Sequence, residues 1–188
     1  MTDQELLKYS ETQRGTATRI LSETGLIPFL SKYGKCSVIG SFDLNLMYGP
    51  DIDIVVETDN PRDASMSVIK GLIEKREFQK YQYGDFDKFP RTGRPGGFIV
   101  VLISEVDGVR WETEIWFMEK YSQDKIDRDL RFTEMLTPEN RLTMLRLKQA
   151  REAQGHNKHR ISSTDIYTGV LVDGLTDYDQ ILSKYENK

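Results

Sequence analysis

Two apolar runs joined by a short polar stretch constrain this chain more than any other feature. The first run ends in Val38-Ile39-Gly40-Ser41, and the second, Asp51-Ile52-Asp53-Ile54-Val55-Val56, follows after nine intervening residues. In a strand, residues i and i+2 point to the same face about 7 Å apart, so Asp51 and Asp53 would lie side by side. Two such carboxylates repel each other unless a cation lies between them.

This pattern also specifies which ligands the two runs could bind. Carboxylate oxygens suit Mg²⁺, which keeps several waters and takes further ligands from substrate phosphates. The main-chain amides of Gly40 and Ser41, adjacent at a turn, can bind a phosphate group. The stretch therefore predicts a combined metal and nucleotide site.

These residues resemble the signature of the DNA polymerase beta-type nucleotidyltransferase superfamily, in particular its minimal and antibiotic-type members. That signature is an apolar strand, Gly-Ser, about ten residues, and then Asp-apolar-Asp-apolar, here Gly40, Ser41, Asp51 and Asp53. The resemblance implies an α+β nucleotidyltransferase fold. We expect a small mixed sheet of about five strands, flanking helices and a C-terminal helical appendage.

The family places a third carboxylate on a neighbouring strand, and the stretch 109–117 offers two candidates. Glu114 stands where related enzymes have Asp, and Glu112 is the alternative on the same strand face. The chain departs from the family in two ways. Phe42-Asp43-Leu44-Asn45 replaces the usual small residue, Arg and Gly, so a phosphate-facing Arg is missing. The third carboxylate is also longer by one methylene.

The resemblance implies Mg²⁺-dependent transfer of a nucleoside monophosphate, with ATP as the expected nucleoside triphosphate and AMP as the transferred group. Two Mg²⁺ ions are expected, one on Asp51 and Asp53 and one that Glu114 also binds. Glu114 is further expected to accept the proton of the acceptor hydroxyl. The expected acceptor is a small molecule. The alternatives are an antitoxin-type enzyme that adenylylates a partner protein, and an inert relative that binds nucleotide or partner.

Several basic side chains could supplement this site. Lys148 is predicted to bind the nucleotide's phosphates, and Arg151 on the same predicted helix could join it. For Arg91 and Arg94 a solvated loop is the first interpretation and phosphate or acceptor contact the second. The run His156-Asn157-Lys158-His159-Arg160 could suggest a metal site or a general base, because its two His residues are three apart. An exposed basic connector between helices is the favoured interpretation, and a positive cluster that reaches the nucleotide's phosphates is the alternative.

Composition narrows the class of protein. Thirty acidic residues against 26 basic ones give a formal charge of −4, which makes a nucleic-acid partner unexpected. The single Cys36 fits a reducing compartment and predicts a buried small hydrophobe. Without a basic, apolar leader or an apolar run near 18 residues, the chain is expected to be cytoplasmic and not to enter a membrane. One of Trp111 and Trp116 is expected in the core, and a stacking platform for a nucleobase is the alternative role.

The order of predicted elements divides the chain into a catalytic core, residues 1–120, and a helical region, residues 121–188, packed on it. Helices are predicted over 3–23, 28–33, 61–77, 123–134 and 137–154, with two more beginning at capping boxes Ser162/Asp165 and Thr176/Asp179. Strands are predicted over 37–40, 52–57, 78–83, 98–103 and 109–118. Asp107-Gly108 predicts a hairpin turn, and 84–97 predicts a long loop.

Overall fold

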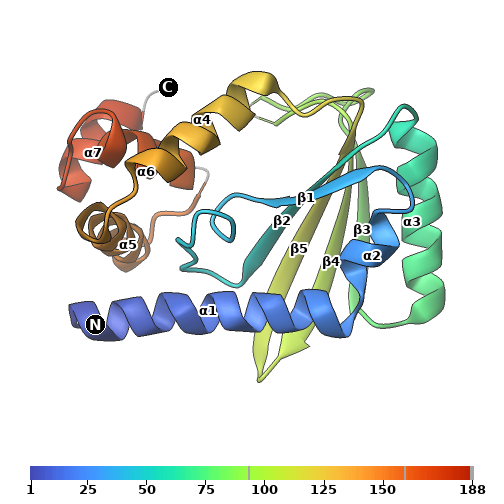
Figure 1. The fold of residues 1–188 in the computed structure, drawn as a ribbon, viewed down its shortest axis with the longest axis horizontal. Helices are drawn as coiled ribbons and strands as arrows, with labels where there is room; N and C mark the ends of the chain where they lie inside the picture. Colours follow the sequence, from blue (N-terminus) through green and yellow to red (C-terminus); the bar gives the residue numbers. More distant parts are fainter. Residues whose placement is uncertain (93, 159, 187–188) are drawn as a thin grey trace.

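The computed structural model describes residues 1–92, 94–158 and 160–186. Its centre is one five-stranded sheet in the order β1-β2-β5-β4-β3. The strands are β1 (Lys35–Ile39), β2 (Asp51–Glu57), β3 (Lys80–Asp85), β4 (Phe98–Val106) and β5 (Val109–Met118). The helices are α1 (Asp3–Glu23), α2 (Leu26–Leu30), α3 (Pro61–Lys75), α4 (Gln123–Met135), α5 (Pro138–Ala153), α6 (Ser163–Leu171) and α7 (Tyr178–Tyr185) (Figure 1).

The sheet is mixed, as predicted. Strands β2 and β5 pair in parallel, and the other three strand pairs are antiparallel. Asp107 and Gly108 join β4 to β5 and both have positive φ angles, 54° and 74°. Left-handed backbone at both central residues is the requirement of a tight hairpin turn, so the predicted hairpin is confirmed.

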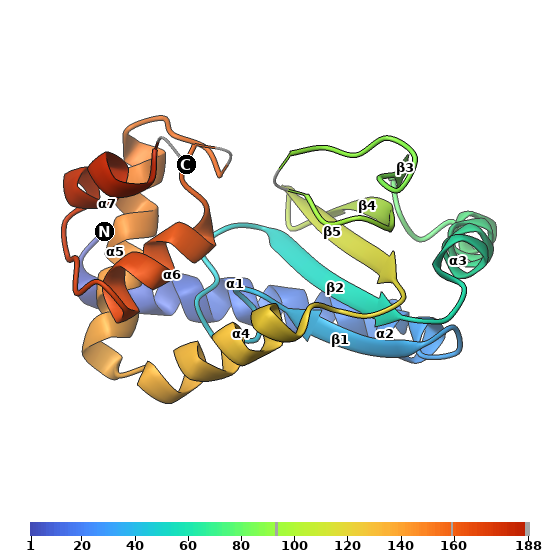
Figure 2. The same ribbon diagram turned by 90° about the horizontal axis from the view of Figure 1, so that it is seen from above.

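Helices cover one face of the sheet and leave the other for the site. Alternate residues of β2 and β5, including Ile54 and Ile115, are fully buried against α1, α2 and α3. Because side chains alternate across a strand, Asp51 and Asp53 point to the opposite face. Figures 1 and 2 show that α5, α6 and α7 lie beyond the end of the sheet, away from α3, whereas α4 runs beside β1.

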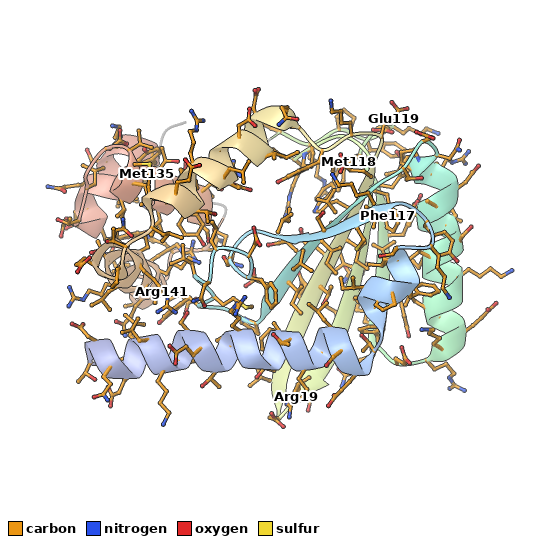
Figure 3. All side chains as sticks on the ribbon, viewed as in Figure 1. Arg19, Phe117, Met118, Glu119, Met135 and Arg141 are labelled. Carbon is orange, nitrogen blue, oxygen red and sulfur yellow. The ribbon has the colours of Figure 1, made fainter. Side chains whose placement is uncertain are left out.

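A second hydrophobic core lies between the N-terminal half of α1, residues 44–48 and the C-terminal helices. Its fully buried side chains include Leu46, Leu145 and Ile166. Arg141 at the start of α5 donates to the main-chain carbonyl of Asn45 at 3.0 Å, and Figure 3 shows its place beside these helices. This core takes residues from both sides of residue 120, and the domain boundary there stays a prediction.

Two predicted helix starts differ from the observed ones. Helix α2 begins at Leu26, two residues before Pro28, because Gly25 adopts a left-handed conformation that ends α1 and lets the chain re-enter helix. Helix α7 is capped by Asp177, whose carboxylate accepts from the amides of Asp179 and Gln180, so the predicted Thr176 capping box is wrong. A carboxylate at the N-cap also interacts favourably with the helix dipole.

Among the described residues, no helix combines the length and the apolar character needed to cross a membrane.

Candidate active site

The strand register brings the predicted carboxylates together. Asp51 is the parallel partner of Glu112, and Asp53 is the partner of Glu114. All four side chains line one cavity of about 610 Å³, which is also lined by Gly40 and Ser41. The parallel pairing of β2 with β5, whose partner residues are 61 apart in sequence, is what assembles this acidic face.

The turn after β1 lies directly against Asp53. Gly40 has a φ of +72°, and a Cβ added there would lie 3.1 Å from an Asp53 carboxylate oxygen. Glycine is therefore favoured at this position both by its backbone conformation and by the close approach of the carboxylate. The turn that would hold a phosphate and the strand that would hold a metal are thus packed together.

Asp53 carries the strongest electrostatic signature of the acidic face. Burial first, and then the negative charges of Asp51 and Glu114, raise its pKa to about 7. A divalent cation among these oxygens would relieve that repulsion, so the donor set fits the Mg²⁺ that the sequence predicts. Asp51, Asp53 and Glu114 are the residues that would hold it.

Two basic side chains now neutralise part of this acidic face. Lys158 forms an ion pair with Asp51, and Arg94 forms one with Glu114 at 3.2 Å. In the part of the chain that the structure describes, no three metal-binding side chains are gathered closely enough to coordinate one ion. Convergence of the three carboxylates on a single ion therefore stays a prediction, although they line the same cavity.

Ser41 is held by two side chains from the C-terminal helices. Lys148 donates to its Oγ at 3.0 Å and to the main-chain carbonyl of Leu46 at 2.6 Å. The Tyr167 hydroxyl lies 2.9 Å from the same Ser41 oxygen. Lys148 is only 2% exposed, and this burial lowers its pKa to about 7. The fold therefore places a cation immediately behind the predicted phosphate-binding serine.

Replacing Tyr167 with Phe should weaken nucleotide binding by about 3- to 10-fold, the effect of one ordinary hydrogen bond. Lysine offers only donors, so Ser41 accepts from Lys148; if Tyr167 also donates, the Ser41 hydroxyl hydrogen is free for a phosphate oxygen. Titration with a fluorescent nucleotide measures the effect. Combined with Ser41→Ala, Tyr167→Phe should add little; additive losses would show that the two hydroxyls act separately.

A smaller cavity of about 280 Å³ adjoins the first. It shares Asp53, Glu114 and Tyr167 with the larger cavity and is also lined by Trp116 and Tyr121. The Trp116 ring is 5% exposed and stacks on Phe86 with centroids 5.4 Å apart. Its indole nitrogen donates to Glu114 at 3.3 Å. One tryptophan thus helps to fix the predicted third carboxylate.

The long loop before β4 is fixed to this region through aromatic contacts. The guanidinium of Arg94 lies 5.8 Å from the Trp116 ring centroid, and that of Arg91 lies 5.6 Å from the Phe86 ring centroid. Such cation–π contacts contribute roughly 0.5–1 kcal/mol each where exposed. Arg94 therefore reaches the site, whereas Arg91 contacts the loop's own aromatic ring.

Other candidates lie elsewhere or have structural partners. Trp111 is in the main core, at 2% exposure. His156 bonds to the Tyr178 hydroxyl and to Arg160, within the C-terminal helices, and His159 lies outside the described residues. Cys36 is half-buried against the main core, and burial raises its pKa to about 11. The Cys36 thiol therefore stays protonated near neutral pH and is unreactive.

Sequence reasoning missed Tyr167 as a functional candidate and considered Lys158 only as part of the basic run 156–160, not as a partner of Asp51. Both reach the site from segments more than 100 residues from Ser41 and Asp51, and neither belongs to a local motif. A larger cavity of about 770 Å³ at the start of α3 contains none of the predicted site residues. It is lined by Asp59, Asn60, Arg62, Asp63, Asp87 and others.

Comparison with solved structures identifies the fold. The polymerase core of TRAMP, an RNA surveillance complex, matches with a TM-score of 0.53 over 87% of this chain and 47% of that chain, at 18% identity. A cytoplasmic RNA terminal U-transferase matches with a TM-score of 0.55 over 89% of this chain and 53% of that chain, at 16% identity. No protein-family model matches, and no curated protein matches the sequence.

The chain therefore has a nucleotidyltransferase-like fold, and the predicted fold class, a mixed five-stranded sheet with flanking helices and C-terminal helices, is confirmed. It spans about half the length of the two solved structures described above.

Proposed function

We propose that the protein is a nucleotidyltransferase that moves AMP from ATP to the hydroxyl group of an acceptor. The observation that carries this proposal is the register of β2 and β5, which sets Asp51 and Asp53 against Glu112 and Glu114. The same cavity contains Ser41, which Lys148 supports from behind. Crowded carboxylates beside a phosphate-binding turn are what metal-assisted phosphoryl chemistry requires.

The acidic residues divide into two roles in this proposal. Asp51, Asp53 and Glu114 would hold Mg²⁺, which supplies charge neutralisation for the phosphates and acidifies the acceptor hydroxyl. Glu114 also lies on the wall shared with the smaller cavity, where it can accept the hydroxyl proton. The Trp116 indole fixes the orientation of this carboxylate.

The basic and hydroxyl groups serve the phosphates. The amides of Gly40 and Ser41 and the Ser41 hydroxyl donate hydrogen bonds to the triphosphate, and Lys148 supplies positive charge. Lys148 takes over the role of the Arg that is missing after Gly40-Ser41. Because these donors are held in place before the reaction, they stabilise the charge that develops on the departing pyrophosphate without reorganising.

Replacing Lys148 with Met should lower nucleotide affinity by about 10- to 100-fold, the effect of one charge-assisted hydrogen bond. The fold lowers the pKa of Lys148 from 10.5 to about 7, so the charged form is available mainly below that value. Wild-type affinity should therefore fall as pH rises above 7, and the variant should lose this part of the pH dependence. Isothermal titration with ATP across pH 6–9 tests both expectations, with the melting temperature as the folding control.

The acceptor is proposed to be a small molecule that enters the smaller cavity beside Glu114. A cavity of about 280 Å³ suits one compact ligand or the end of a longer one. Both similar solved structures are named for work on RNA, so a terminal RNA hydroxyl is the second candidate. A partner protein is the third, as in antitoxin-type enzymes.

The decisive experiment offers the pure protein Mg²⁺, α-labelled nucleoside triphosphates and three acceptor pools: hydroxylated small molecules, short RNA, and cell protein. Label transfer with pyrophosphate release is the expected result, with ATP as the best donor. Label in the RNA or protein pool alone would keep the reaction class and overturn the small-molecule acceptor. Nucleotide binding without transfer to any pool would favour an inert relative.

A further inference from the structure

The metal-binding face and the C-terminal helices are joined by one ion pair. Lys158 lies in the connection between α5 and α6, and its ammonium group pairs with Asp51. The Lys158 side chain is about half exposed, whereas that of Asp51 is 25% exposed. The ammonium group therefore reaches from the cavity rim down to the carboxylate face.

The main chain around Lys158 is anchored by hydrogen bonds, so the lysine side chain can move while the segment between α5 and α6 stays in place. The Asn157 carbonyl accepts from the amides of Arg160 and Ile161, and the Arg160 amide also donates to the Asn157 side chain at 3.1 Å. Arg160 in turn pairs with Glu186. Rotation about the flexible lysine stem is enough to redirect the ammonium group.

A metal ion that binds Asp51 must displace this ammonium group. Two cations close to one carboxylate repel each other, and the displaced Lys158 would face that repulsion in a confined cavity. A bound nucleotide would reduce this repulsion. Its phosphates would lie near Ser41 in the same cavity, where they would offer the Lys158 ammonium group a new anionic partner.

We propose that Lys158 exchanges partners, holding Asp51 in the metal-free protein and the nucleotide's phosphates once a metal–nucleotide complex enters. Free metal then binds weakly and metal with nucleotide binds tightly, since each ligand removes a cost that the other would meet alone. This inference rests on the proposed nucleotide site. It makes Lys158 a positioning residue that couples the two ligands.

The test compares Lys158→Met with Lys35→Met. Lys35 is a matched control, because it pairs with Glu57 at 3.2 Å at the other end of the same strand, outside the site cavity. Mn²⁺ affinity is measured without nucleotide by electron paramagnetic resonance. The affinity for Mn²⁺ with a non-hydrolysable ATP analogue is measured by calorimetry.

The exchange predicts changes of opposite sign in one variant. Lys158→Met should bind free Mn²⁺ about 3- to 10-fold more tightly and the Mn²⁺–nucleotide complex about 3- to 10-fold more weakly. Lys35→Met should leave both affinities unchanged, and Lys158→Arg should restore the tight binding of the complex. Lys158→Gln repeats the test with an uncharged polar side chain, should the Met variant fold poorly.

Two results would overturn the exchange. If Lys158→Met weakens the binding of both free Mn²⁺ and the Mn²⁺–nucleotide complex, the lysine has only a structural role in the site. If the variant changes neither affinity, the ion pair has no role in binding. Wild-type protein that binds no Mn²⁺–nucleotide complex would instead refute the proposed function itself, so the two failures are distinguishable.

Discussion

Asp53→Asn is expected to reduce nucleotidyl transfer by three orders of magnitude or more while leaving the fold at least as stable as the wild type. The substitution keeps the size and hydrogen bonding of the side chain. It removes the negative charge that is repelled by Asp51 and Glu114. Charge held by a metal supplies several kcal/mol of transition-state stabilisation, and each 1.36 kcal/mol is about tenfold in rate. Label transfer and Mg²⁺ affinity are the two measurements.

The difference in stability between this variant and the wild type should depend on pH in a defined direction. The folded-state pKa of Asp53, about 7, exceeds the ordinary value of 3.8, so the folded protein binds more protons than the unfolded chain between these values. Wild-type stability therefore falls as pH rises from about 4 to 7. Asp53→Asn removes this loss, and at pH 8 in a metal chelator it should be more stable by about 1–2 kcal/mol.

The opposite pattern would contradict the assignment. If Asp53 were a structural residue, replacing it should cost roughly 1–3 kcal/mol because its hydrogen-bond partners would be left unsatisfied. A destabilised variant with unchanged Mg²⁺ affinity would show that Asp53 is structural. Denaturant melts at pH 4.5 and pH 8 separate the two cases, because the metal-site model predicts a difference between wild type and variant mainly at the higher pH.

Glu114→Gln should lower the transfer rate by at least about 100-fold, and Glu112→Gln should change it by only a few-fold. Glu114 faces Asp53 across the strand pair, its side chain is 18% exposed, and it interacts with Trp116 and Arg94. Glu112 faces Asp51, is 43% exposed and pairs loosely with Arg110 at 3.8 Å. A charge in the less exposed position interacts more strongly with a developing charge.

This pair of variants is its own control, since both remove one charge from the same strand face. Steady-state rates with ATP and the identified acceptor provide the measurement, together with Mn²⁺ affinity. If Glu112→Gln is the inactive variant, the third-carboxylate assignment moves to Glu112 and the reaction class is retained. Equal, small effects would remove β5 from the metal site altogether.

Local chemistry in the sequence was enough to predict much of the fold. Alternation in β5 predicted which of its residues would share a face, because side-chain direction in a strand repeats every two residues. Asp107-Gly108 predicted the β4–β5 turn, since few residues tolerate the backbone that a tight hairpin requires. The helix start at Asp177 was missed because neighbouring residues Thr176 and Asp177 both offer side-chain caps, and local sequence does not rank them.

The site required the tertiary structure. The sequence alone determined the acidic pair Asp51 and Asp53 and the Gly40-Ser41 turn, because their spacing is set by backbone geometry. Only the tertiary structure decided that β5 pairs in parallel with β2, that Tyr167 meets Ser41, and that Lys158 reaches Asp51. These contacts join residues 61 to 126 apart in sequence. Such contacts form because the two hydrophobic cores bring the segments together. These cores depend on the burial of apolar side chains from the whole chain, and no local motif specifies them.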